Sequence, residues 1–164
     1  MGAKIAVYPG SFDPIHNGHL DIIQRCVPLF DEVVVAVLRN DEKRPLFPEA
    51  ERVAMIESVL ADFPGTRVET FSGLLVDFTR RIGARVVVRG LRAVSDFENE
   101  FQMALMNRRL DPRVETLFMM PREDYSYLSS RLLKEVAKLG GELTGLAPPM
   151  VLERLRARLA AARA

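Results

Sequence analysis

The stretch YPGSFDPIHNGHL, residues 8–20, contains both histidines of the chain, spaced three residues apart. It follows a short apolar run and also holds Ser11, two glycines and two prolines. In an open α/β sheet, the loop after the first strand borders the crevice in which ligands bind. His16 and His19 could donate hydrogen bonds to phosphate oxygens there, next to a helix start that favours anions. The stretch therefore predicts a phosphate site, with an ordinary strand-to-helix turn carrying surface histidines as the alternative.

Other chemistries fit these residues less well. A zinc site would need further ligands, but the chain has no third histidine and a single cysteine, Cys26. The P-loop and G-x-G-x-x-G fingerprints are absent, so phosphate binding here would need another design. Neither Ser11 nor Cys26 has the neighbours of an activated nucleophile, and the aspartates show no paired spacing for acid–base work. The sequence therefore favours electrostatic stabilisation of charged groups.

Basic residues follow other predicted strands. The sequence RGLR comes directly after a run of three valines and places Arg89 and Arg92 at the carboxyl end of that strand. Gly90 between them allows a ligand to approach the backbone. The loop NDEKRPLF carries Lys43, which could clamp a charged substrate. Solvated surface charges are the alternative interpretation for each segment.

The sequence YSYLSSRLLKE, residues 125–135, follows the last predicted strand. Ser129 and Ser130 begin a helix, where serines ordinarily act as N-caps. If this helix start faces the crevice, its amides and hydroxyls form a second phosphate cradle. Glu100 lies on another predicted helix, where an acidic side chain is ordinarily solvated.

Length and charge limit the possible classes of protein. The 164 residues suit one compact domain, and we expect a single domain over residues 1–164. Lys and Arg number 23 against 22 Asp and Glu, so no strong field attracts nucleic acid or an anionic membrane. A lone cysteine suits a reducing compartment, and we see neither a signal peptide nor a stretch of about 20 apolar residues. We expect a cytoplasmic protein that binds neither nucleic acids nor membranes.

Apolar β-branched runs predict five strands, at residues 5–7, 33–38, 68–71, 86–88 and 114–118. They show little polar alternation, as expected for strands covered on both faces. Segments with helical spacing separate them, which implies parallel pairing through right-handed crossovers. Residues 132–139 and 151–159 predict consecutive helices, and Pro28 predicts an early end or a kink in the first helix. The predicted fold is α/β: a doubly wound, Rossmann-like, five-stranded parallel sheet with C-terminal helices.

The motifs also resemble those of a known family. GSFDPIHNGH is similar to the [TH]-x-G-H signature of nucleotidylyltransferases, and the two serines before a helix resemble their second motif. Within that group, YPGSFDP…NGHLDII, RGLRAVSDFENEFQMALMNR and YSYLSSRLLKEV resemble segments of the phosphopantetheine adenylyltransferases, in order and over nearly all of the chain. The resemblance implies transfer of an adenylyl group from ATP to 4′-phosphopantetheine, giving dephospho-coenzyme A and pyrophosphate. It further implies Mg²⁺, with ligands left open, a homohexamer, and feedback inhibition by coenzyme A.

The resemblance also implies roles for individual residues. His19 would bind ATP and stabilise the transition state, Ser11 would contact both substrates, and Phe12 would give ATP a backbone contact. 4′-Phosphopantetheine would also be held by Lys43, Leu75 and Arg89. The remaining ATP contacts fall on Gly90, Leu91, Arg92, Glu100, Tyr125, Ser126, Tyr127, Leu128, Ser129, Ser130 and Arg131.

Two residues depart from the family pattern. His16 stands where the family commonly has threonine; it could add a phosphate contact or merely be tolerated, and we favour tolerance. Arg131 stands where the family usually has a hydroxyl residue, and it could bind ATP phosphates or point to solvent.

Two other functions remain open from the sequence. Nicotinate mononucleotide adenylyltransferases often have histidine at the position of His16, but the short chain and the complete RGLRAVSDFENE block disfavour them. A catalytically silent nucleotide sensor is the second alternative. Retention of His19, Lys43, Arg89 and Arg92 disfavours it.

Overall fold

The computed structural model describes residues 2–39, 44–92 and 94–162. Its centre is a five-stranded sheet in the order β3-β2-β1-β4-β5, with every neighbouring pair parallel. The strands are β1 (Ile5–Gly10), β2 (Glu32–Leu38), β3 (Thr66–Phe71), β4 (Val86–Gly90) and β5 (Glu115–Met119). The predicted α/β sheet and its five strands are confirmed, and the order changes direction at β1 as a doubly wound fold requires.

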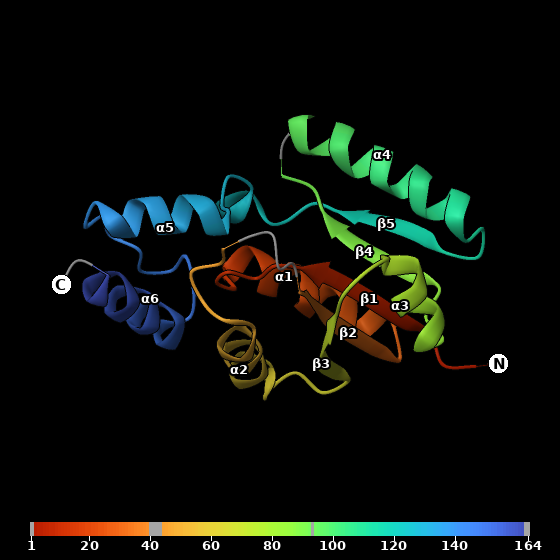
Figure 1. Ribbon diagram of the computed structural model, residues 1–164, viewed down its shortest axis with the longest axis horizontal. Coiled ribbons are helices and arrows are strands. Elements are labelled where there is room, and N and C mark those ends of the chain that lie inside the picture. Colours follow the sequence, from red (N-terminus) through yellow and green to blue (C-terminus); the bar gives the residue numbers. More distant parts are fainter. Residues whose placement is uncertain (1, 40–43, 93, 163–164) are drawn as a thin grey trace.

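Helices connect the strands and cover the sheet (Figure 1). They are α1 (Asn17–Cys26), α2 (Glu49–Leu60), α3 (Leu75–Arg81), α4 (Val94–Leu110), α5 (Ser130–Lys138) and α6 (Pro149–Ala161), with short 3₁₀ turns η1 (Val27–Leu29) and η2 (Glu123–Tyr125). The helix α1 ends at Cys26, just before Pro28, as predicted. The two predicted C-terminal helices are confirmed as α5 and α6, which lie side by side in Figure 1. Within the described residues, no helix has the length and apolar character needed to cross a bilayer.

Strand β2 shows why the apolar runs lack polar alternation. Val33, Val35 and Val37 pack in a core with α1, α2, α5 and α6. Val34 and Ala36 point to the other face, where they pack with α3. All five side chains are fully buried. Burial on both faces explains why residues 33–37 of this strand are all apolar.

The strands β1 and β4 separate halfway along their length. Their register contains only the pairs Ala6–Val86 and Val7–Val87. Beyond these pairs, β1 continues to pair with β2, and β4 with β5. A crevice therefore opens at the carboxyl ends of β1 and β4, which is the place where ligands bind in doubly wound sheets.

Asp13 ties the loop after β1 to two other segments. Its carboxylate accepts hydrogen bonds from the backbone N–H groups of Leu46 and Phe47, each at 2.9 Å, and pairs with the Lys134 ammonium at 2.7 Å. The side chain is almost completely buried, so these partners replace water. Asp13 thereby fixes the β1–α1 loop relative to α5 and to the segment before α2.

We expect Asp13→Asn to lower the free energy of unfolding by about 3 kcal/mol, because the amide leaves the Lys134 charge unpaired and turns an N–H₂ group toward donors. Urea denaturation at fixed protein concentration measures the change. Asp62→Asn, at an exposed position, is the control and should change stability by less than about 0.5 kcal/mol. Equal stabilities of Asp13→Asn and the unsubstituted protein would contradict the role assigned to Asp13.

Candidate active site

A cavity of about 470 Å³ lies at the crevice between β1 and β4. We call it the histidine cavity. It brings together the ends of β1 and β4, the loop after β1, the start of α1 and the start of α5. Its lining includes Ser11, Phe12, His16, His19, Arg89, Gly90, Arg92, Glu100, Tyr125, Leu128, Ser129, Ser130 and Arg131.

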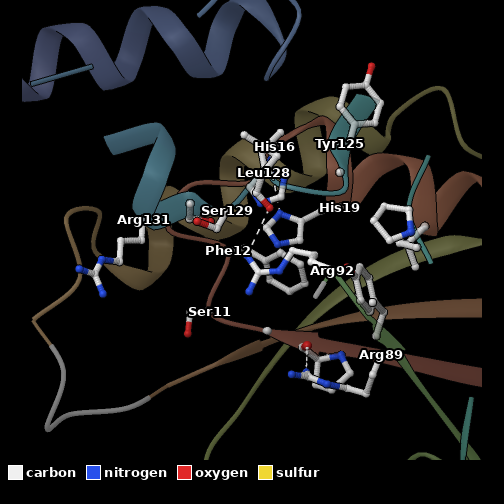
Figure 2. A pocket seen from close by; sticks show the side chains of 18 of the residues that line it. Ser11, Phe12, His16, His19, Arg89, Arg92, Tyr125, Leu128, Ser129 and Arg131 are labelled. Carbon is white, nitrogen blue, oxygen red and sulfur yellow. Dashed lines mark hydrogen bonds between the residues drawn. The ribbon is translucent and has the colours of Figure 1, made fainter. Parts of the chain in front are cut away.

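His19 lies at the centre of this cavity, among His16, Phe12 and Arg92 (Figure 2). The backbone N–H of His16 donates to Nδ1 of His19 at 3.2 Å. Since Nδ1 is thereby an acceptor, the proton of the neutral ring is on Nε2. The Phe12 ring packs edge-on at 5.0 Å and the His16 ring stacks at 3.6 Å, between centroids. The imidazole is thus held as an Nε2–H donor.

Burial keeps both histidines uncharged. Desolvation lowers the pKa of His19 well below its usual value, and the nearby charges of Arg92 and Arg89 and the His16 ring act in the same direction. Desolvation, with a smaller contribution from Arg92, lowers the pKa of His16 to about 3. Nδ1 of His16 is buried and makes no hydrogen bond with the described residues. The site therefore presents neutral imidazole donors at neutral pH.

Gly18 is needed for this histidine pair. A Cβ atom at Gly18 would lie 3.1 Å from both Cε1 and Nδ1 of His16 and 3.4 Å from Cβ of Tyr125. A contact of 3.1 Å between carbon atoms is shorter than the optimum separation of about 3.5–4.0 Å. The small residue thus lets the start of α1 approach the stacked rings.

Arg89 and Glu100 form a bidentate ion pair at the floor of the crevice. Nε and Nη2 of Arg89 lie 2.6 and 2.5 Å from the two carboxylate oxygens. Nη1 donates to the carbonyl of Pro9 at 2.7 Å, which bridges β4 to β1 where the two strands have separated. Glu100 therefore fixes the direction of a guanidinium that sequence analysis treated as an independent ligand-binding group.

Two further cavities meet the histidine cavity at Ser11. The basic cavity, of about 480 Å³, is lined by Asp13, Arg44, Arg52, Lys134 and neighbours. The apolar cavity, of about 420 Å³, is lined mainly by α4, the start of α3 and the strand ends, including Leu75 and Arg89. Ser11 lines all three and is exposed. A molecule in the histidine cavity can therefore meet one from the apolar cavity next to Ser11.

Some of the predicted site residues lie outside the histidine cavity. Leu75 lines the apolar cavity. Lys43 lies outside the described residues. Leu91, Ser126 and Tyr127 do not line the histidine cavity, although they are close to it in sequence. Their proposed contacts with ATP stay predictions.

Arg131 lines the mouths of the histidine and basic cavities but points away from His19 (Figure 2). Its side chain is 89% exposed and its Nε pairs with Glu135, one turn further along α5, at 2.9 Å. Ser129 caps α5 by accepting from the Leu132 N–H, and the Ser130 hydroxyl donates to the Pro14 carbonyl. Ser129 thus caps α5, and Ser130 links α5 to the loop after β1, while both also line the cavity.

Three residues that line the cavities, Tyr8, Arg52 and Lys134, were not predicted from the sequence. Tyr8 packs against Phe12 and lines the histidine cavity, and burial raises its phenol pKa far above the usual range. Arg52 and Lys134 line the basic cavity next to Ser11. Arg52 lies on the buried face of α2, three residues before Met55. A charged residue on the apolar face of a helix is the sequence signal that could have predicted its role.

The described residues offer no cage for a metal ion. No group of three or more His, Cys, Asp or Glu side chains among them could hold one. The carboxylates that line the cavities, Asp13 and Glu100, are engaged by N–H groups, Lys134 and Arg89. Burial also raises the pKa of Cys26 to about 11, so its thiol is not a ready nucleophile.

Comparisons with known proteins place the chain in a family. The Cytidylyltransferase-like family profile matches residues 7–136. A phosphopantetheine adenylyltransferase of Heliobacterium modesticaldum is 60% identical over 92% of this chain and 90% of the relative. That of Geotalea daltonii is 58% identical over 96% of this chain and 98% of its own length. Among solved structures, one from Vibrio parahaemolyticus is described as a nicotinate-nucleotide adenylyltransferase by provisional assignment. It superposes with a TM-score of 0.70 over 94% of this chain and 99% of that one, at 17% sequence identity. At this identity the likeness supports the fold alone.

The buried His16 predicts a dependence of stability on pH. Its pKa is about 3 in the folded protein and about 6.5 in an unfolded chain. Between these values the unfolded state binds one more proton, so stability falls as the pH falls. Relative to His16→Thr, the stability of the unsubstituted protein should decrease by about 1.4 kcal/mol per pH unit between pH 6 and pH 4. Urea denaturation of both proteins measures this difference, and parallel pH curves would refute it.

Proposed function

The chain belongs to the phosphopantetheine adenylyltransferases of the cytidylyltransferase-like family, and from that membership and the geometry of its cavities we propose the following reaction and site. The protein transfers an adenylyl group from ATP to 4′-phosphopantetheine and releases dephospho-coenzyme A and pyrophosphate, a step of coenzyme A biosynthesis. ATP occupies the histidine cavity, and the pantetheine arm occupies the apolar cavity.

The meeting of the cavities at Ser11 is the observation that supports this assignment best. The apolar cavity suits an uncharged arm, and Arg89 lies where this cavity joins the histidine cavity. The reacting phosphate of 4′-phosphopantetheine then faces the α-phosphate of ATP beside Ser11. Holding the two reactants in this way converts a bimolecular reaction into an effectively unimolecular one.

The proposed reaction needs no general base. The second pKa of a phosphate monoester is near 6, so the attacking phosphate is largely a dianion at neutral pH. The difficulty is the accumulation of negative charge on the α-phosphate and on the departing pyrophosphate. Nε2–H of His19 donates to the α-phosphate, and Arg92 and the first amides of α5 hold the phosphate chain. This explains a site that has fixed donors and, in the part of the chain that the structure describes, no acid–base pair of carboxylates.

Magnesium enters this proposal as part of the substrate. Mg²⁺ prefers several water ligands and phosphate oxygens to an all-protein cage. The two carboxylates of the described residues that line the three cavities, Asp13 and Glu100, are engaged with other groups, so we infer that the ion arrives bound to ATP. Coenzyme A shares the pantetheine arm and the adenine nucleotide of the product, and we propose that it inhibits by occupying the same two cavities.

We also propose that the chain forms a homohexamer, with α4 at a subunit interface. The exposed side chains of α4 include Phe97, Phe101 and Leu105, which are 44 to 49% exposed. The Phe97 and Phe101 rings stack at 5.6 Å between centroids, and Leu105 lies one turn further along the same side of the helix. Such exposed apolar patches are typical of association surfaces.

His19→Ala should lower kcat by at least about 10²-fold, comparable with the loss of one oxyanion donor. Pyrophosphate release on mixing Mg–ATP with 4′-phosphopantetheine measures the rate. Nicotinate mononucleotide, as the alternative acceptor, should give no release. Near-normal turnover by His19→Ala would remove His19 from this role, and absence of release by the folded unsubstituted protein would overturn the proposed reaction.

The double substitution Phe101→Glu/Leu105→Glu should convert the assembly to smaller species, because carboxylates replace the apolar contact surface. Light scattering coupled to gel filtration measures the mass. Leu29→Glu, at a leucine that is 56% exposed on η1, is the matched control and should keep the mass unchanged. A monomeric unsubstituted protein, or an unchanged mass in the double variant, would contradict the proposed interface.

A further inference from the structure

Arg52 is a buried arginine that contacts the backbone at the site. It extends from α2 and is 4% exposed. Nη1 donates to the carbonyl of Ser11 at 2.6 Å and to that of Leu38 at 3.4 Å, and Nε donates to the carbonyl of Phe47 at 3.1 Å. No carboxylate of the described residues forms an ion pair with it. Burying a charged group costs free energy unless it finds partners. The three carbonyl groups supply such partners, and the question is what the buried guanidinium holds in place.

The Ser11 contact fixes the orientation of one peptide group. The Ser11–Phe12 peptide is trans, so its carbonyl and the N–H of Phe12 point in opposite directions. With the carbonyl held by Arg52, this N–H is turned to the opposite side of the peptide. Phe12 lines the histidine cavity, and its N–H makes no hydrogen bond with the described residues. A donor is thereby left available at the site.

The conformation of Phe12 agrees with a held peptide. Its φ is +47°, which is uncommon for a residue with a side chain and is typically stabilised by its surroundings. The Phe12 ring is 2% exposed, and a Cβ at Gly10 would lie 3.0 Å from it. The ring fixes one side of the residue, and the Arg52 contact fixes the peptide on the other side.

Arg52 is itself held in place. The Phe47 peptide carbonyl accepts from Arg52, while the N–H groups of Leu46 and Phe47 donate to Asp13. Asp13 lies one residue after Phe12 and pairs with Lys134 of α5. The guanidinium therefore belongs to a connected set of contacts around the loop after β1.

We propose that Arg52 is a positioning residue that turns the N–H of Phe12 toward the phosphate chain of a nucleotide bound in the histidine cavity. It acts through the Ser11–Phe12 peptide and does not touch the substrate. This inference rests on the proposed function only in placing a nucleotide in that cavity. Loss of Arg52 frees the peptide to rotate, so that the nucleotide loses a donor.

The sequence permits a direct test of this peptide. Ser–Phe occurs once in the chain, at residues 11–12, so labelling serine carbonyl carbons with ¹³C and phenylalanine nitrogens with ¹⁵N gives one NMR signal from that peptide. Adding the unreactive analogue α,β-methylene-ATP should shift the Phe12 amide proton downfield in the unsubstituted protein. In Arg52→Met, which keeps the volume and loses the donors, this shift should disappear and kcat should fall by about 10²-fold.

Arg52→Lys keeps the charge and a single donor group, and it should restore part of the shift and of kcat. It also carries the test if Arg52→Met does not fold. Arg39→Met removes an exposed arginine that pairs with Glu49 at the start of α2 and should keep the full shift. The other phenylalanine amides report whether each variant is folded.

A folded Arg52→Met that shows the full Phe12 shift would overturn the proposal, because a merely structural role would leave this signal unchanged. The outcome is separable from failure of the proposed function. A normal Phe12 shift without synthesis of dephospho-coenzyme A would refute the reaction alone. Synthesis without a Phe12 shift in the unsubstituted protein would refute the positioning role alone.

Discussion

The separation of β1 from β4 after Val7 and Val87 is the constraint on which the site depends. Backbone hydrogen-bonding groups released from a sheet must find other partners when they are buried. At this point the Pro9 carbonyl finds the Arg89 guanidinium, which Glu100 in turn holds from α4. The separation of the two strands thus opens the crevice, and it also leaves the Pro9 carbonyl to hold the Arg89 guanidinium across it. Because β1 ends at Gly10, beyond this separation, the loop that carries both histidines leaves the sheet at the edge of this crevice.

The histidines show how burial selects the form of a donor. Desolvation disfavours a charged His19 imidazole, and the nearby charges of Arg92 and Arg89 disfavour it further. The neutral ring with its proton on Nε2 keeps a directed donor and avoids this cost. It also needs little reorganisation when charge develops on a phosphate, which is the property that makes fixed dipoles effective in catalysis. His16 contributes a ring that stacks on His19, and its backbone N–H, which any residue except proline would supply, selects the tautomer of His19.

The sequence predicted the fold, and its strand ends, glycines and helix starts predicted part of the lining of the histidine cavity, because these local signals have a known place in doubly wound sheets. The resemblance to the family supplied the rest of the predicted lining, namely Phe12, Glu100, Tyr125, Leu128 and Arg131. The sequence did not predict the partners of these residues. The pairing of Arg89 with Glu100 joins β4 to α4, and the contact of Arg52 with Ser11 joins α2 to the loop after β1. Neither contact has a local pattern, since both depend on how distant elements pack. Arg52 had one signal, its position on the buried face of α2 three residues before Met55.

Carboxylates that line the cavities would repel negatively charged reactants unless their own charge were compensated. Asp13 is surrounded by two backbone N–H groups and the Lys134 ammonium, and Glu100 by the Arg89 guanidinium. Each carboxylate is thus matched by donors at hydrogen-bond distance, where the Coulomb interaction is strongest. Among the described residues, Arg52 contacts carbonyl groups and forms no ion pair with a carboxylate, so these residues leave its positive charge beside Ser11 uncompensated. Pairing the acids locally, with no described carboxylate paired with Arg52, favours a positive potential in the cavities, which suits two phosphate-bearing reactants.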